Sequence, residues 1–228
     1  MLKPPVVDYR KLRPNNINSP EFRHLKLLIF WPLFGLAFAF VEFDIMHRTY
    51  QVMHCALDDA IPFCEFFLIP YMFWFVYLIF PIVYTLLYDI DAFERMTKYT
   101  IITYCVTMLI YFIYPTCQEL RPTEFARSNI FVTIVKHFYN FDTNTNVNPS
   151  LHVVGAVVSM VGMLHTEALS RTAAMRVGHV ASAVLIIAST VFMKQHSVLD
   201  IPPALFICLA AYPIVYGKKA RRADVRLA

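Results

Sequence analysis

The chain has 228 residues, of which 58% are hydrophobic and only 16% are charged, and its mean hydropathy is +0.52. Soluble domains average about half apolar and a quarter charged residues, so this composition excludes an ordinary soluble protein and predicts an all-α integral membrane protein. The formal net charge of +4 is small, and the basic residues flank apolar segments instead of forming one stripe. This distribution argues against a nucleic-acid partner.

Residues 1–24 are polar and Pro-rich, and we expect an N-terminal tail without a cleavable signal peptide. Residues 25–217 are expected to form one membrane domain, and residues 218–228 a basic C-terminal tail. A membrane-spanning helix needs about 20 mostly apolar residues. Six segments meet this condition: Leu25–Phe43, Ile61–Tyr88, Tyr99–Tyr114, Pro149–His165, Arg176–Phe192 and Pro202–Tyr216.

Most Lys and Arg residues lie in the two tails, the loop after the second span and the loop after the fourth. The positive-inside rule therefore predicts that both termini are cytoplasmic. Between the third and fourth spans, residues 125–138 show helical spacing of apolar side chains, typical of a helix that lies on the membrane or packs on the bundle. The small size and the lack of N-glycosylation acceptors favour a bacterial plasma membrane.

Five cysteines are present, without the spacing of a metal site. Cys105 and Cys208 lie inside apolar spans and are expected to be packing residues. Cys55, Cys64 and Cys117 fall in outer segments, where an oxidising compartment permits a disulfide between two of them.

Three clusters of polar residues interrupt the apolar pattern, and the expected topology puts all three on the outer side. An ionisable residue at a membrane span is energetically expensive, so each cluster is a candidate functional site. The clusters are Arg121 after the third span, Ser150 and His152 at the start of the fourth, and Ser189, Lys194, His196 and Asp200 between the fifth and sixth.

The segment from Asn148 to His152 predicts a helix start. Asn is a favourable N-cap and Pro is favoured at the first helical position, so we expect the helix to begin at Pro149. The backbone N–H groups of such a start, together with the Ser150 hydroxyl, suit a phosphate group. An ordinary capped helix with a surface histidine is the simpler alternative.

His196 and Asp200 are four residues apart, close enough to meet on a helical face or in a turn ahead of Pro202. A carboxylate bonded to Nδ1 would fix the imidazole tautomer and leave Nε2 available as a nucleophile or base. A surface His–Asp pair is the alternative. Arg121 offers a planar guanidinium that suits phosphate oxygens, or it reaches the membrane interface.

Together these residues resemble the signature segments of the type 2 phosphatidic acid phosphatase superfamily, the lipid phosphate phosphatases related to vanadium haloperoxidases. The family patterns are K-x6-R-P, P-S-G-H and S-R-x5-H-x3-D. The corresponding segments here are Arg121-Pro122, Pro149-Ser150-Leu151-His152, and Ser189-Thr190 followed by His196 and Asp200. The resemblance covers residues 60–217, and the six-helix membrane fold of the family agrees with the predicted topology.

The chain departs from the family at four positions. The family Lys, Gly, Arg and final Gly are replaced by Tyr114, Leu151, Thr190 and Ala204. Two phosphate-binding cations are therefore missing, and Lys194 and Lys136 are the candidate replacements. Segments that match the family patterns this loosely are similar to those of the inositol phosphorylceramide synthase branch. Hydrolysis and head-group transfer are therefore both expected as possible reactions.

The resemblance implies a lipid phosphate phosphatase that acts on phosphatidate or a prenyl diphosphate at the extracytoplasmic face, without metal or cofactor. It implies that His196 attacks phosphorus, that Asp200 holds His196, and that His152 protonates the leaving alkoxide and then activates water or an alcohol. The phosphate would be bound by Arg121, Ser150, Ser189 and Lys194.

Two interpretations from other classes stand beside this one. His152, His196 and Asp200 have the residue types of a two-His-one-carboxylate metal site. A small transporter is the non-enzymatic alternative, although transporters usually place polar residues near the membrane midplane and often contain inverted repeats, whereas this chain shows no repeat.

Overall fold

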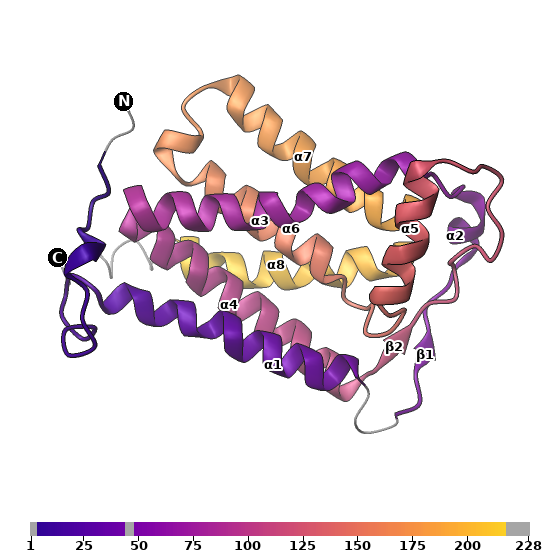
Figure 1. Ribbon diagram of the computed structural model, residues 1–228, viewed down its shortest axis with the longest axis horizontal. Coiled ribbons are helices and arrows are strands. Elements are labelled where there is room, and N and C mark those ends of the chain that lie inside the picture. Colours follow the sequence, from indigo (N-terminus) through magenta and orange to yellow (C-terminus); the bar gives the residue numbers. More distant parts are fainter. Residues whose placement is uncertain (1–3, 44–47, 218–228) are drawn as a thin grey trace.

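The computed structural model describes residues 4–43 and 48–217, which form a mostly helical bundle (Figure 1). The helices of this bundle are α1 (Phe30–Glu42), α2 (Ala56–Ala60), α3 (Leu68–Tyr88), α4 (Ile90–Ile113), α5 (Ile130–Phe141), α6 (Leu151–Leu164), α7 (Ala173–Phe192) and α8 (Ile201–Tyr216). Two short parallel strands, β1 (Gln51–Val52) and β2 (Thr116–Cys117), join the loops at one end. The predicted basic tail, residues 218–228, lies outside the described residues.

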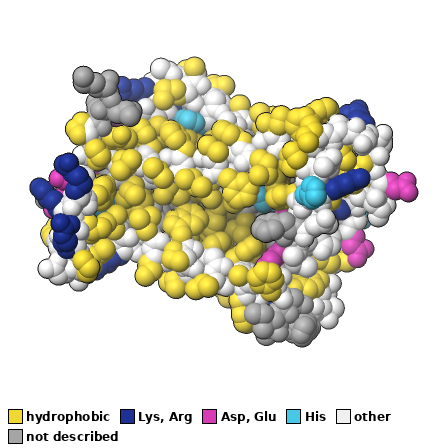
Figure 2. All heavy atoms as spheres, viewed as in Figure 1, with side chains coloured by type: hydrophobic (Ala, Val, Ile, Leu, Met, Phe, Trp, Pro, Cys, Tyr) yellow, Lys and Arg dark blue, Asp and Glu magenta, His cyan; other side chains and the backbone are white. Residues whose placement is uncertain are grey.

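Within the described part of the chain, five helical segments are long and apolar enough to cross a membrane. These segments are Arg23–Glu42, Glu65–Tyr88, Ile90–Ile113, Ala173–Phe192 and Val198–Tyr216. Figure 2 shows the matching surface, in which a broad apolar band separates two ends that carry the charged side chains. These features agree with the expected all-α class of multi-pass membrane protein.

The fourth predicted span is a helix, but a short one. Helix α6 has 14 residues, which at 1.5 Å per residue is about 21 Å, less than the roughly 30 Å of a hydrocarbon core. It packs against α3, α4, α7 and α8 and buries most of its residues, so its neighbours shield it from lipid.

The third predicted span was placed too late in the chain. Helix α4 begins at Ile90 and not near Tyr99, because the Asp89 side chain accepts a hydrogen bond from the Ala92 backbone and caps the helix there. The charged first turns of α4 extend beyond the apolar stretch, so hydropathy alone does not mark the start.

The N-terminal segment, expected as a tail, lies against the bundle. The Val6 amide donates to the Leu87 carbonyl, and the Tyr9 hydroxyl donates to the Leu86 carbonyl, both at the end of α3. Phe22 is almost fully buried. The N-terminal segment and the end of α8 therefore lie at the same end of the bundle (left in Figure 1).

Helix α5 covers the opposite end of the bundle, where it crosses the ends of α3 and α7 (right in Figure 1). Val135 of α5 is fully buried, and Phe131 and Phe138 pack against Leu68 and Tyr71 of the α3 region. The apolar face of this segment is thus used mainly for packing on the bundle, which is one of the two alternatives that its sequence allowed.

Candidate active site

His196 lies in the short connection between α7 and α8, at the end of the bundle that α5 covers. Its Nδ1 is 3.0 Å from the Asp200 Oδ2 atom and 3.0 Å from the Val147 carbonyl oxygen. Both partners are acceptors, so Nδ1 carries the proton and the Nε2 lone pair is available. This arrangement provides the orientation that a nucleophilic or basic imidazole requires.

The turn that carries His196 and Asp200 is fixed by Asp58 of α2. Ser197 and Asp200 form a capping box at a 3-10 helix, and the Ser197 hydroxyl donates to Asp58 at 2.6 Å. The Val198 amide donates to the other Asp58 oxygen at 2.8 Å. Burial alone would raise the pKa of Asp58, but the hydrogen bonds from Ser197, Val198 and Cys55 lower it. Asp58 is a positioning residue that sequence reasoning did not identify.

His152 lies in the first turn of α6, and its ring centroid is 5.7 Å from that of His196. The imidazole contacts the rings of Tyr71 and Trp74 of α3, with centroid distances of 4.4 and 4.5 Å. Its Nε2 atom is buried without a hydrogen-bond partner in the described structure. Packing therefore fixes the ring while leaving a nitrogen available for a ligand.

The predicted start of this helix was wrong by two residues. Helix α6 begins at Leu151 with Ser150 as its N-cap, because the Ser150 hydroxyl accepts from the Val153 amide. The Asn148 side chain is used elsewhere, as its amide donates to the Leu199 carbonyl at 3.4 Å.

Both histidines line one cavity of about 470 Å³, which we call the histidine cavity. Its walls come from α1, α3 and α4, and its apolar part includes Phe34, Gly35, Phe75 and Ile79. Phe75 and Ile79 are exposed at the outside of the bundle, so the cavity reaches the apolar surface between α1 and α3. Figure 2 shows this hollow in the apolar band. A lipid chain could enter here from the side.

The outer end of the histidine cavity is acidic. Glu42 at the end of α1 and Asp142 after α5 both line it, and Glu42 accepts a hydrogen bond from Thr143. Burial raises the pKa of Asp142 to about 6, while the nearby Arg121 opposes this shift. No Lys or Arg is among the described residues that line the cavity. This pairing could not be predicted from the sequence, because the two carboxylates are far apart in the chain.

Arg121 does not line the cavity. Its two Nη atoms donate to the carbonyls of Tyr139, Asp142 and Thr143 and to the Gln195 side chain, at 2.6 to 3.0 Å. These four bonds use all four Nη hydrogens, so only the Nε hydrogen is left to donate. In this structure the guanidinium anchors the end of α5 instead of facing a ligand.

The other three predicted phosphate-binding residues are also engaged with the backbone. Lys194 donates from Nζ to the carbonyls of Asp58 and Ile61 at 2.6 and 2.5 Å. Ser189 donates to the Ile186 carbonyl within α7, and the N-cap Ser150 is fully buried. None of them lines the histidine cavity, and neither does Lys136, the other candidate replacement, which is exposed and lies over the Phe125 ring.

The structure therefore brings together His152, His196 and Asp200 but directs the four phosphate-binding candidates elsewhere. All five cysteines are free thiols. Among the residues that the structure describes, no group of three or more His, Cys, Asp or Glu is arranged to hold a metal ion. Asp200 instead hydrogen bonds to the Nδ1 atom of His196.

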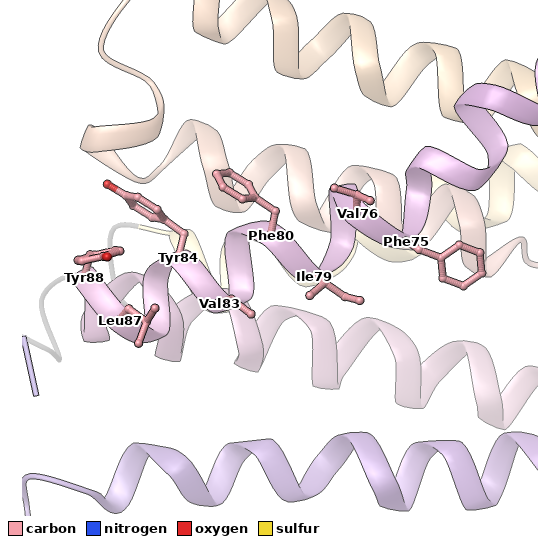
Figure 3. Close-up of a pocket in the computed structure, with 8 residues that line it drawn as sticks. All are labelled: Phe75, Val76, Ile79, Phe80, Val83, Tyr84, Leu87 and Tyr88. Atoms are coloured by element: carbon pink, nitrogen blue, oxygen red, sulfur yellow. The ribbon is translucent and has the colours of Figure 1, made fainter. Parts of the chain in front are cut away.

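A second hollow, of about 460 Å³, lies on the outer face of α3 and has a different character. Figure 3 shows that all eight lining side chains come from this one helix, from Phe75 to Tyr88. The lining is almost entirely apolar and holds no histidine or charged group. Such a surface suits contact with lipid chains and provides no histidine or charged group that could act on a substrate.

Comparison with known proteins gave no relative: no family model matches the chain, and neither the curated proteins nor the solved structures contain a significant match. A function for the chain is therefore inferred from the motif resemblance and from the geometry of the histidine cavity.

Proposed function

We propose that the protein is a membrane enzyme that cleaves a phosphoester bond of a lipid through a covalent intermediate on His196. The observation that carries this proposal is the 3.0 Å hydrogen bond from His196 Nδ1 to Asp200, which leaves Nε2 available beside His152. The adjoining apolar walls of the histidine cavity fit the chains of a lipid.

In the proposed reaction, Nε2 of His196 attacks phosphorus while the bond to the leaving oxygen breaks. Protonated His152 gives its proton to that oxygen, and Asp200 stabilises the positive charge on the His196 ring. A water or an alcohol then attacks the phosphohistidine and gives its proton to His152. The phosphorus–nitrogen bond breaks, and His196 is regenerated.

With water as acceptor, this chemistry makes the protein a lipid phosphate phosphatase. With an alcohol as acceptor, it makes a head-group phosphotransferase, and one observation favours this second candidate. A phosphomonoester carries close to two negative charges at neutral pH, whereas a phosphodiester carries one. The cavity is lined by Glu42 and Asp142 and by no described Lys or Arg, so a phosphodiester is the better electrostatic match.

We place the site on the extracytoplasmic side of a bacterial plasma membrane, with α6 as the fourth of six spans. The distribution of Lys and Arg along the sequence supports this orientation. The buried surroundings of α6 support a span shorter than 20 residues, because neighbouring helices and not lipid surround it.

The test is to trap the intermediate. Protein in detergent, incubated with lipids labelled at phosphorus, should acquire acid-labile label, and His196→Ala should acquire none and lose at least about 10³-fold in turnover. His137→Ala is the matched control, because His137 is an exposed histidine of α5. Wild-type activity in His196→Ala would disprove the mechanism.

A further inference from the structure

Two buried amide side chains line the histidine cavity, and each has one polar atom without a partner in the described structure. Near the histidines, Gln195 accepts from Arg121 through Oε1, and its Nε2 donor is buried without a partner in the described structure. Near Glu42, Asn146 donates through Nδ2 to the Val41 carbonyl and to Glu42, and its Oδ1 acceptor is left unpaired. Both side chains are more than nine-tenths buried, being 3% and 4% exposed.

Leaving a buried polar atom unpaired costs free energy, so these atoms point to a ligand that satisfies them. An unpaired donor beside two imidazoles suits phosphate oxygens. An unpaired acceptor in the cavity that Glu42 and Asp142 also line suits a positively charged group. Such a group either donates a hydrogen bond to the acceptor oxygen or attracts it electrostatically.

Aromatic rings line the same cavity as the two carboxylates. They come from Phe34 and Phe38 of α1 and from Tyr104 and Tyr111 of α4. Ring faces attract ammonium groups, most strongly when the site is shielded from water. Carboxylates and rings in one cavity are a combination suited to an alkylammonium group.

We infer that the acidic part of the histidine cavity binds the ammonium group of a zwitterionic phospholipid of the ethanolamine or choline type. This inference rests on the proposed function, in which the phosphate of the same lipid lies between His152 and His196. The substrate is then matched along its length, with acyl chains at the α1–α3 opening, phosphate at the histidines and ammonium at Glu42 and Asp142.

The first experiment compares phospholipids that have the same acyl chains and choline, ethanolamine or glycerol head groups. Wild-type protein should consume the two ammonium lipids at least about tenfold faster than the glycerol lipid, which corresponds to roughly 1.4 kcal/mol. Glu42→Gln and Asp142→Asn should each remove most of this advantage by slowing only the ammonium lipids. Gln and Asn keep an oxygen acceptor, so the hydrogen bonds around them are largely retained.

The matched control is Glu119→Gln, which removes an exposed carboxylate that does not line the cavity and should keep the full preference. A second readout does not need turnover. Phosphocholine should raise the melting temperature of the wild-type protein more than glycerol 3-phosphate does, and Glu42→Gln should lose this difference.

The outcomes separate the inference from the proposed function. Equal consumption of all three lipids, with no effect of Glu42→Gln, would overturn the ammonium site and leave the phosphohistidine mechanism standing. Stabilisation by phosphocholine that depends on Glu42, without consumption of any lipid, would overturn the enzyme proposal and support the ammonium site. A protein that shows neither a preference for the ammonium lipids nor stabilisation by phosphocholine would also overturn the ammonium site.

Discussion

At the scale of single residues, Lys194 links the connection between α7 and α8 to the α2 segment. Its ammonium donates to two carbonyls of that segment. These partners lie more than 130 residues away in the chain, at Asp58 and Ile61. Sequence spacing predicted the pairing of His196 with Asp200 because the two residues are close in the chain. It could not predict the contacts of Lys194, because their partners are distant in the chain.

Asp142 gives a prediction on stability against pH. Burial raises the pKa of Asp142 from an ordinary 3.8 to about 6 in the folded protein, partly offset by Arg121 and His196 and reinforced by Glu42. The folded state therefore holds the proton more tightly than the unfolded state. This contribution to stability is full below pH 4 and is lost as pH rises through about 6.

Asp142→Asn should consequently be more stable than the wild type at pH 7.5, by about 1–2 kcal/mol, and no more stable at pH 4. Thermal unfolding in detergent at a series of pH values measures this difference. Glu119→Gln serves as control. A gain that is the same at every pH would show that Asp142 is not the titrating group.

At the scale of elements, α6 packs too closely on its neighbours to accept a larger side chain at Gly155. A Cβ atom on Gly155 would lie 2.7 Å from the Tyr104 hydroxyl and 2.8 Å from Trp74 Nε1. Trp74 also contacts the His152 ring, so a displacement at Gly155 reaches the site. At Gly162 the nearest atom, 2.7 Å away, belongs to the flexible side chain of Met96.

Gly155→Ala should therefore lower both stability, by about 1–3 kcal/mol, and the rate of lipid turnover. Gly162→Ala should cost less, because Met96 can rotate away. Gly178→Ala in α7 should be neutral or slightly stabilising, because nothing lies within 4 Å of its Cβ position. Melting temperatures and turnover of the three variants test this order, and an equal loss at all three would contradict it.

The elements themselves were largely predictable. Every apolar stretch of the predicted spans contains a helix, because a lipid-facing chain must pair its own backbone groups. Boundaries set by side-chain caps were less accessible, as at Asp89 and Ser150, because each has another possible cap residue two positions away. The meeting of Glu42 and Asp142 at one cavity depends on tertiary packing and had no local signal.

At the scale of the whole molecule, helix α1 packs chiefly on α4, and the opening between α1 and α3 leads to the histidines. Gly35 lies in the wall of this opening, and a Cβ atom there would meet nothing within 4 Å. The opening can therefore be narrowed without disturbing the bundle.

Gly35→Leu should keep the melting temperature of the wild type but reduce turnover of long-chain lipids about tenfold, with a smaller effect on short-chain analogues that leave the opening partly empty. Turnover rates for lipids with a series of acyl chain lengths measure this difference between long and short chains. An equal loss for all chain lengths would indicate that acyl chains do not pass Gly35.

Helix α5 covers the end of the bundle, whereas the histidine cavity opens to the side, into the apolar band. A substrate that enters this way diffuses in two dimensions and never dissolves in the aqueous phase. The reaction rate then follows the mole fraction of the substrate within the bilayer and not its bulk concentration. Adding inert lipid at constant total substrate slows such an enzyme by surface dilution, and the lipid product must diffuse back along the same plane before the next molecule can take its place.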